Sequence, residues 1–78
     1  RPNPSSGLPA VVFTLPSGAP ARLELFDLAG RRVDSREVGA LGAGEHTIRL
    51  GTDLAPGIYV ARLTQEARTR TARLAVTR

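Results

Sequence analysis

The stretch IYVARLTQEARTRTARLAVT, residues 58–77, decides the fold because it contains two strand patterns separated by a short turn. Apolar residues occupy every second position over residues 59–63 and 72–76, and a period of two places each set on one face of a strand. The inward set of the first half is Tyr59, Ala61 and Leu63. The inward set of the second half is Ala72, Leu74 and Val76. The stretch therefore predicts an antiparallel hairpin that turns around residues 65–67 and buries one face.

Shorter runs upstream also show strand and turn patterns. Residues 11–15 alternate in the same way, and so do residues 22–25 of a strand that runs on to residue 27. Residues 27–31 combine an aspartate that caps a turn with a glycine for a left-handed position. Residues 31–38 carry many charges and place Val33 and Val38 at opposite parity, which indicates an edge strand with room for a bulge. The glycine-rich residues 39–44 are interpreted as a flexible connection into a strand over residues 45–50.

The remaining segments complete the domain plan. Thr52 or Asp53 is a candidate cap for one helical turn before the tight corner at Pro56 and Gly57. The proline-rich residues 1–9 are predicted to be a linker and leading extended segment, and residues 10–78 a single domain. The predicted fold class is all-β: a small immunoglobulin-like Greek-key β-sandwich of six to seven mostly antiparallel strands.

Composition restricts the classes of function. The 78 residues include no cysteine, a single histidine and no run of about 20 apolar residues that would span a membrane as a helix. A chain this short has little core to spare for a catalytic cleft. All 11 basic residues are arginines, and the net charge of +4 is interpreted mainly as a solubility device. With only three aromatic residues for stacking on bases, nucleic acid is not an expected partner.

No reactive centre is predicted. His46 shares parity with Ile48 and Leu50, which indicates a histidine packed at the margin of the core, and no serine lies in a nucleophile elbow. The acidic residues follow no catalytic or metal-binding spacing and are interpreted mostly as solvated surface. They are Glu24, Asp27, Asp34, Glu37, Glu45, Asp53 and Glu66. We therefore expect no catalytic residues, no metal and no cofactor.

Five segments occur in a characteristic order along nearly the whole chain: PNPSSG, FTLPSGAPARLELFDLAGRRV, GAGEHTIRL, DLAPGIYVARL and RLAVTR. This order resembles the C-terminal sorting domain of proteins exported by the type IX secretion system of certain Gram-negative bacteria. It is also similar to the immunoglobulin-like domain of the flagellar hook-capping protein. The chain departs from the sorting-domain pattern at two places, where Arg73 replaces a lysine and residues 65–67 lack the usual turn glycine.

The resemblance implies export rather than catalysis. It implies that the domain is covalently part of a larger cargo protein, is read by the outer-membrane translocon and its surface-attachment machinery, and reaches the cell surface or the medium. The residues that match the family's motifs are the binding candidates Gly57, Tyr59, Arg73, Leu74 and Val76. Structural roles are expected for Gly57 in a turn and for Tyr59 in the core, with its hydroxyl bonded at the rim.

Two other functions are weighed against sorting. The alternative is a non-catalytic structural or assembly module, such as a hook-capping-like domain or a spacer in a multidomain extracellular enzyme. A carbohydrate-binding sandwich would display an exposed aromatic platform, and the low aromatic content disfavours that function.

Overall fold

The computed structural model describes residues 10–51 and 54–76. Within these residues the chain forms six strands and one short 3-10 helix. In chain order they are β1 (Ala10–Leu15), β2 (Ala21–Asp27), β3 (Arg32–Glu37), η1 (Gly39–Leu41), β4 (Gly44–Arg49), β5 (Gly57–Gln65) and β6 (Arg68–Val76). Over the same residues no helix has the length and apolar character needed to cross a membrane.

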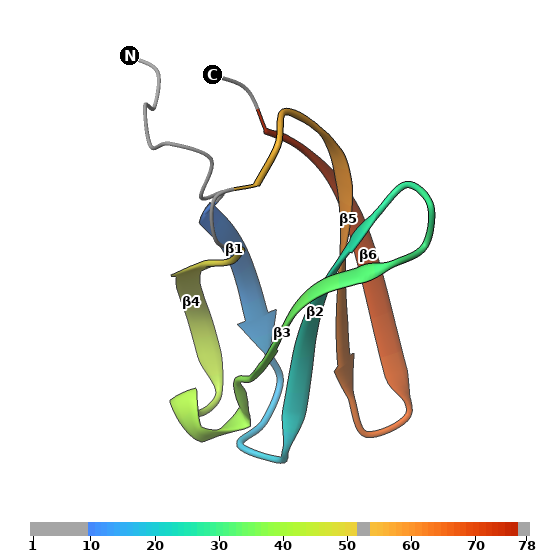
Figure 1. Ribbon diagram of the computed structural model, residues 1–78. Coiled ribbons are helices and arrows are strands. Elements are labelled where there is room, and N and C mark those ends of the chain that lie inside the picture. The colour runs from blue at the N-terminus through green and yellow to red at the C-terminus, as the bar shows by residue number, and fades with distance from the viewer. Residues whose placement is uncertain (1–9, 52–53, 77–78) are drawn as a thin grey trace.

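The strands form two antiparallel sheets (Figure 1). The small sheet pairs β1 with β4, and the large sheet has the order β3-β2-β5-β6. The chain leaves the large sheet after β3, forms β4 in the small sheet and returns as β5 beside β2. This return past the first hairpin is a Greek-key connection. The predicted small all-β sandwich is therefore confirmed.

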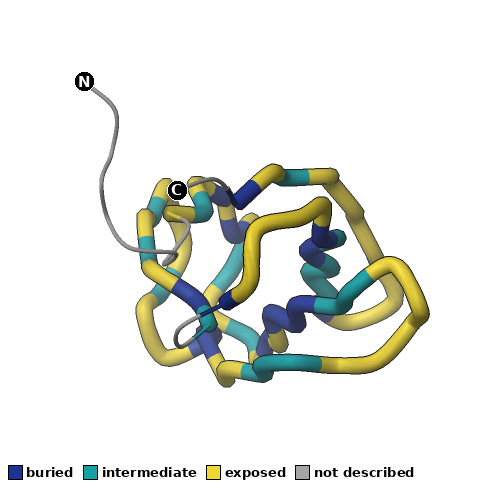
Figure 2. The backbone as a smooth tube through the Cα atoms, turned by 45° about the horizontal axis from the view of Figure 1, so that its top comes forward, coloured by how far each residue is buried: buried dark blue, intermediate teal, exposed yellow. Residues whose placement is uncertain are grey.

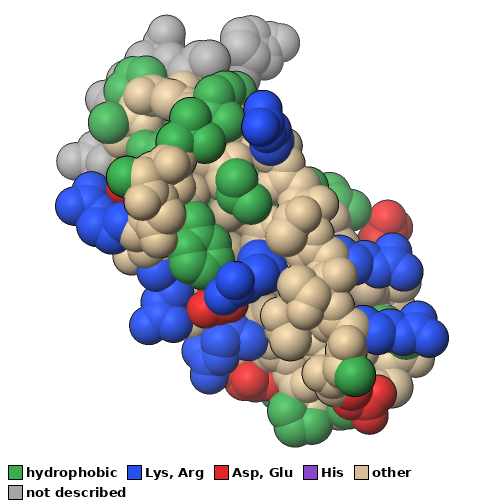
Figure 3. Space-filling model, turned by 90° about the vertical axis from the view of Figure 1, so that its right-hand side faces the viewer, with side chains coloured by type: hydrophobic (Ala, Val, Ile, Leu, Met, Phe, Trp, Pro, Cys, Tyr) green, Lys and Arg blue, Asp and Glu red, His purple; other side chains and the backbone are tan. Residues whose placement is uncertain are grey.

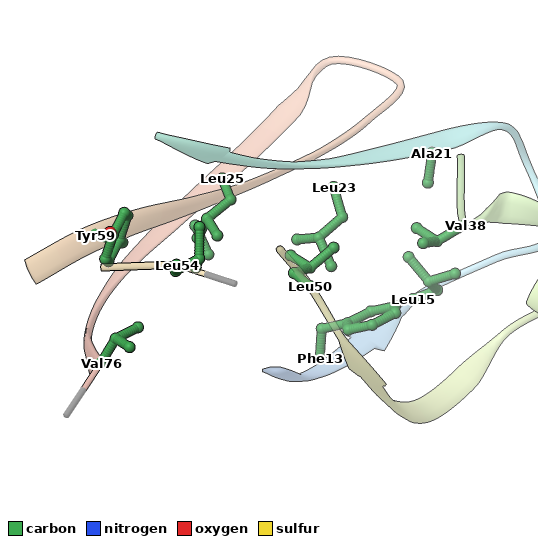
Figure 4. Close-up of a cluster of buried hydrophobic side chains, with 11 residues drawn as sticks. Phe13, Leu15, Ala21, Leu23, Leu25, Val38, Leu50, Leu54, Tyr59 and Val76 are labelled. Atoms are coloured by element: carbon green, nitrogen blue, oxygen red, sulfur yellow. The ribbon is translucent and has the colours of Figure 1, made fainter. Parts of the chain in front are cut away.

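The core lies between the two sheets. Side chains of alternate residues on β1 and β2 point into this space, as their sequence pattern predicts, whereas Val12 on the other face of β1 is exposed. Figure 4 shows Leu23 directed toward Leu50 and Phe13, and Figure 2 shows buried and exposed residues alternating along the strands. The buried apolar residues are Phe13, Leu15, Ala21, Leu23, Leu25, Val38, Leu50, Leu54, Tyr59, Ala61 and Val76.

The turn between β2 and β3 follows the sequence prediction. The Oδ1 atom of Asp27 accepts hydrogen bonds from the backbone N–H groups of Ala29, at 3.0 Å, and Arg31, at 2.9 Å. Gly30 supplies the left-handed position with φ of 88°. The predicted bulge also occurs: Val33 is the extra residue, because the register moves from Leu25 opposite Asp34 to Phe26 opposite Arg32.

Two loop predictions have different outcomes. Residues 39–44 do not form the loose connection that their glycines indicate, because residues 39–41 form η1 and Gly39 is buried. A Cβ atom on Gly39 would lie 2.5 Å from the carbonyl oxygen of Ala19, so this glycine permits a close approach of two backbone segments. The helical turn predicted to be capped by Thr52 or Asp53 involves residues outside the described part of the chain.

The predicted inner stripe of β6 is only partly buried. Val76 is buried and Leu74 half-buried, but Ala72 is exposed although it pairs with the buried Ala61 on the inner face of the sheet. The reason is the unequal width of the layers: two strands cannot cover a sheet of four. The prediction that Ala72 is buried is therefore wrong, and the inner face of β6 remains open along part of its length.

Candidate functional site

The candidate site is the hairpin of β5 and β6, which forms one side of the large sheet. The two strands pair along nine residue positions, from Gly57 opposite Val76 to Gln65 opposite Arg68. The two-residue turn places Glu66 in the left-handed region with φ of 56°. Glycine is the usual residue at such a position, so the absence of a turn glycine leaves Glu66 in an unfavourable backbone conformation without changing the hairpin.

The structure brings four of the five binding candidates together at the open end of this hairpin. Tyr59 pairs with Leu74, and Gly57 pairs with Val76. The hydroxyl of Tyr59 donates a 2.7 Å hydrogen bond to the carbonyl oxygen of Ala55. Since the Tyr59 ring is buried, the expected core role with a bonded hydroxyl is confirmed. Val76 is also buried, so it stabilises the hairpin from within the core.

Gly57 and Arg73 are the two exposed candidates. Gly57 is the first residue of β5, and a Cβ atom there would meet only the Tyr59 ring, at 4.0 Å. Arg73 lies opposite Val60 in the middle of the hairpin. Its neighbours along β6, Ala72 and Leu74, belong to the inner face, so Arg73 extends from the outer face. A partner that contacts the outer face therefore meets Arg73 but not Tyr59 or Val76.

Strand β6 is a basic edge strand. Seven of its nine residues are exposed, and its sequence RTRTARLAV contains three arginines and no acidic residue. Within residues 10–51 and 54–76, no ion pair involves Arg68, Arg70 or Arg73. On the face of the molecule in Figure 3, basic side chains (blue) are more prominent than acidic ones (red). In the part of the chain that the structure describes, the strand thus presents unneutralised positive charge beside a backbone edge that no other strand pairs with.

Sequence reasoning missed a charge network on the outer face of the large sheet. Glu24 is only 7% exposed, so the interpretation of its carboxylate as solvated is wrong. Its Oε1 atom accepts a 3.0 Å hydrogen bond from Nη2 of Arg62, and its Oε2 atom accepts a 3.1 Å bond from Nη1 of Arg32. The Arg62 guanidinium also lies 4.6 Å above the centre of the Phe26 ring.

The network shifts the protonation of Glu24. The hydrogen bond from Arg62 is the largest influence and lowers the pKa of the Glu24 carboxyl, with Arg32 acting in the same direction against the opposing effect of burial. The signal that would have revealed this network is the register, because Glu24 lies directly opposite Arg62 on neighbouring strands. Sequence parity alone does not give that register.

His46 has the structural role that its parity predicts. It is half-buried, its Nε2 atom lies 2.7 Å from the carbonyl oxygen of Gly42, and its ring packs at 5.7 Å from that of Phe13. Among the residues that the structure describes, no three side chains of histidine, cysteine, aspartate or glutamate gather as a metal site.

The fold defines the class of protein: a small antiparallel β-sandwich domain with an exposed basic strand. A family model described as the secretion system C-terminal sorting domain matches residues 2–77. The chain therefore belongs to this family of sorting domains, as the order of its sequence segments indicates. A search of curated proteins found no match.

Membership of this family establishes the general function. The domain is the C-terminal sorting signal for export by the type IX secretion system, and it directs its protein across the outer membrane to the cell surface or the medium. Domains of this family are non-catalytic and form the C-terminal part of a larger cargo protein that the type IX machinery handles.

Proposed function

We propose that the hairpin of β5 and β6 is the surface that an outer-membrane translocon component reads. The observation that carries this proposal is the free edge of β6 with three arginines that have no ion-pair partner among the described residues. A free strand edge offers backbone hydrogen bonds to an added strand, and unpaired arginines attract an acidic surface. The two features together favour a partner with an acidic face.

The five binding candidates then have two kinds of role. Arg73 contacts the partner, because its side chain extends from the exposed outer face of β6. Tyr59, Leu74 and Val76 hold the two strands in register from the core side, and Gly57 begins the first of them. A signal that is read as a folded surface depends on both kinds of residue.

The wider assignment follows from the family. We infer that the chain is covalently joined to a larger cargo, that surface-attachment machinery acts on this cargo after export, and that the domain contributes no catalysis of its own. The support is the family match, because domains of this family are non-catalytic and form the C-terminal part of a larger cargo protein.

A reporter fused to the N-terminal side of residues 1–78 tests the sorting proposal in a host with an active type IX system. We expect the reporter at the cell surface or in the medium. The Arg73→Gln variant should reduce the exported fraction several-fold, whereas Arg31→Gln, which removes an exposed arginine from the β2–β3 turn, should leave export unchanged. Periplasmic retention of the unmodified fusion would refute the sorting role, and equal export of both variants would refute the role of Arg73.

A further inference from the structure

The groove between β1 and the β5–β6 hairpin is the feature that neither the sorting role nor the core explains. It is a hollow of about 320 Å³ lined by residues 11–14 of β1, residues 70–72 of β6, and Leu23, Ala61 and Leu63. The floor is apolar, formed by inward residues of β2 and β5. Among the described residues that line it, Arg70 is the only charged one, so this part of the groove combines an apolar floor with one cation.

Both walls of the groove are strand edges. Consecutive residues of a strand point to opposite faces, so a cavity lined by four successive residues of β1 and three of β6 is bordered by their backbones. Within the described residues, β1 pairs only with β4 and β6 pairs only with β5. Backbone N–H and C=O groups on the groove side of each strand therefore have no strand partner in this part of the chain.

The groove marks the place of a strand that the small sheet lacks. A third strand beside β1 would lie over β5 and β6, whose inner face is open there, as the exposure of Ala72 and the half-burial of Leu63 show. Alternate side chains of this strand would point down onto Leu63 and Ala72, and backbone bonds would form along residues 11–14.

We propose that this groove binds an extended acidic segment of a partner polypeptide, which adds to the free edge of β1 as a third strand of the small sheet. Its inward positions carry aliphatic side chains that fill the hollow and one carboxylate that pairs with Arg70. This inference goes beyond the sorting role of Arg73 on the outer face of β6. It shares Arg70 with the basic strand, but it uses the inner face of the hairpin and the edge of β1.

Charge decides between the possible occupants. Within residues 10–51 and 54–76, Arg70 has no ion pair and no acidic residue lines the groove, so a carboxylate is the complementary group. The chain's own leader, RPNPSSGLP, has three prolines without a backbone N–H and no acidic residue, so it offers fewer backbone donors and no carboxylate for Arg70. The free edge strand β6 of a second copy carries three arginines and would bring like charge to Arg70.

The test uses synthetic peptides and the 78-residue chain. The probe is a labelled nine-residue peptide with serine at outward positions and valine at inward positions, except for one inward glutamate at the position facing Arg70. A second peptide has lysine in place of that glutamate. Binding is followed by fluorescence anisotropy, and amide hydrogen exchange reports whether residues 11–14 gain protection. We expect the glutamate peptide to bind at least about tenfold more tightly than the lysine peptide.

Three variants of the chain give matched comparisons. Arg70→Glu should reverse the preference between the two peptides, whereas Arg73→Glu, the same change on the opposite face of the same strand, should leave the preference unreversed. Ala72→Leu fills the groove from its β6 wall and should weaken binding at least about tenfold without lowering the unfolding midpoint. Because residues 70, 72 and 73 are all exposed, these variants keep the core intact.

Several outcomes would overturn the proposal. Equal affinity for both peptides, binding that Ala72→Leu does not weaken, or binding without new protection at residues 11–14 would each show that no strand enters the groove. Sedimentation of the chain without peptide identifies a competing occupant. Self-association that Ala72→Leu abolishes would assign the groove to a second copy and refute the acidic partner.

Discussion

Strands β2 and β6 belong to the same sheet but have opposite environments. All seven residues of β2 pair with β5, and five of them also pair with β3 on the other side. Four of the seven are buried, three on the core side and Glu24 on the outer face. The nine residues of β6 pair only with β5, and seven of them are exposed. Leu23 of β2 and Ala72 of β6 both belong to an alternating apolar set, yet Leu23 is buried and Ala72 is exposed, so alternation alone does not determine burial.

The number of neighbouring strands and the cover over each face distinguish the residues that stabilise the domain from those that are free to bind. A strand with two neighbours and a covering layer has its backbone bonds and apolar face satisfied within the chain. A strand with one neighbour and a partly missing cover has spare backbone groups, spare apolar surface and unpaired charge. Among the described residues, these unpaired backbone groups and uncovered side chains lie on β6 and on the groove side of β1, so that side of the molecule is the one free to bind.

The largest expected loss of stability comes from truncating a buried side chain of β2. Leu25 is fully buried, so Leu25→Ala should lower the free energy of unfolding by about 3–5 kcal/mol through the loss of apolar contacts and the cavity left behind. The matched control is Ile58→Ala in β5, where the side chain is 40% exposed and the loss should be under about 1.5 kcal/mol. Urea denaturation measures both, and equal losses would contradict the contrast between the covered and open parts of the sheet.

A smaller loss of stability is expected where Gly39 approaches the backbone just before β2. In Gly39→Ala the new methyl group would lie 2.5 Å from the Ala19 carbonyl oxygen and 2.8 Å from the Ala21 nitrogen. The two segments must separate, and the free energy of unfolding should fall by about 1–3 kcal/mol. Gly18→Ala is the control because no atom lies within 4 Å of its Cβ position. A thermal melt in which both variants match the original chain would show that residues 39–41 do not pack as described.

The charge network over β2 predicts a pH-dependent effect. Glu24→Gln removes the carboxylate that Arg32 and Arg62 share and should cost about 1–2 kcal/mol at pH 7, since both arginines are half exposed. Glu45→Gln in the exposed part of β4 should change stability by less than about 0.5 kcal/mol. Urea denaturation at pH 7 measures the unfolding midpoints of both variants. Similar midpoints would show that the Glu24 network does not stabilise the fold.

The sign of the pH dependence follows from the direction of the pKa shift. The pKa of the Glu24 carboxyl is lower in the folded chain than its ordinary value of 4.5, so the folded state favours the charged form. Its contribution to stability is present above that ordinary value and is lost as the pH falls through the folded pKa. The stability difference between the original chain and Glu24→Gln should therefore shrink on acidification from pH 5 to pH 2. A difference that is constant over this range would contradict the assignment.

The smallest expected change in stability is at the turn between β5 and β6. Glu66→Gly relieves a left-handed conformation that costs a non-glycine residue about 1–2 kcal/mol, and the greater freedom of glycine in the unfolded chain offsets about 0.5–1 kcal/mol of that gain. The expected net result is a stabilisation of about 0.5 kcal/mol, seen as a small rise in the melting temperature. Gly30→Ala, which forces alanine into φ of 88°, should shift the melting temperature in the opposite direction.

Much of the fold was predictable from the sequence, and the site less so. The strands, the Asp27 turn, the bulge near Val33 and the core role of Tyr59 follow from local patterns. The burial of Glu24 does not, because it depends on the register that places Arg62 opposite it. The packing of Gly39 depends on a loop that is distant in the sequence.

The amino-acid sequence by itself determined where the chain extends, where it turns and to which family it belongs, because alternation, turn chemistry and motif order are properties of neighbouring residues. Only the tertiary structure decided which faces are covered. That outcome depends on how many strands each layer receives: the small sheet pairs only β1 and β4 within the described residues, so Leu23 is buried while Ala72, with the same inward orientation, faces an open groove.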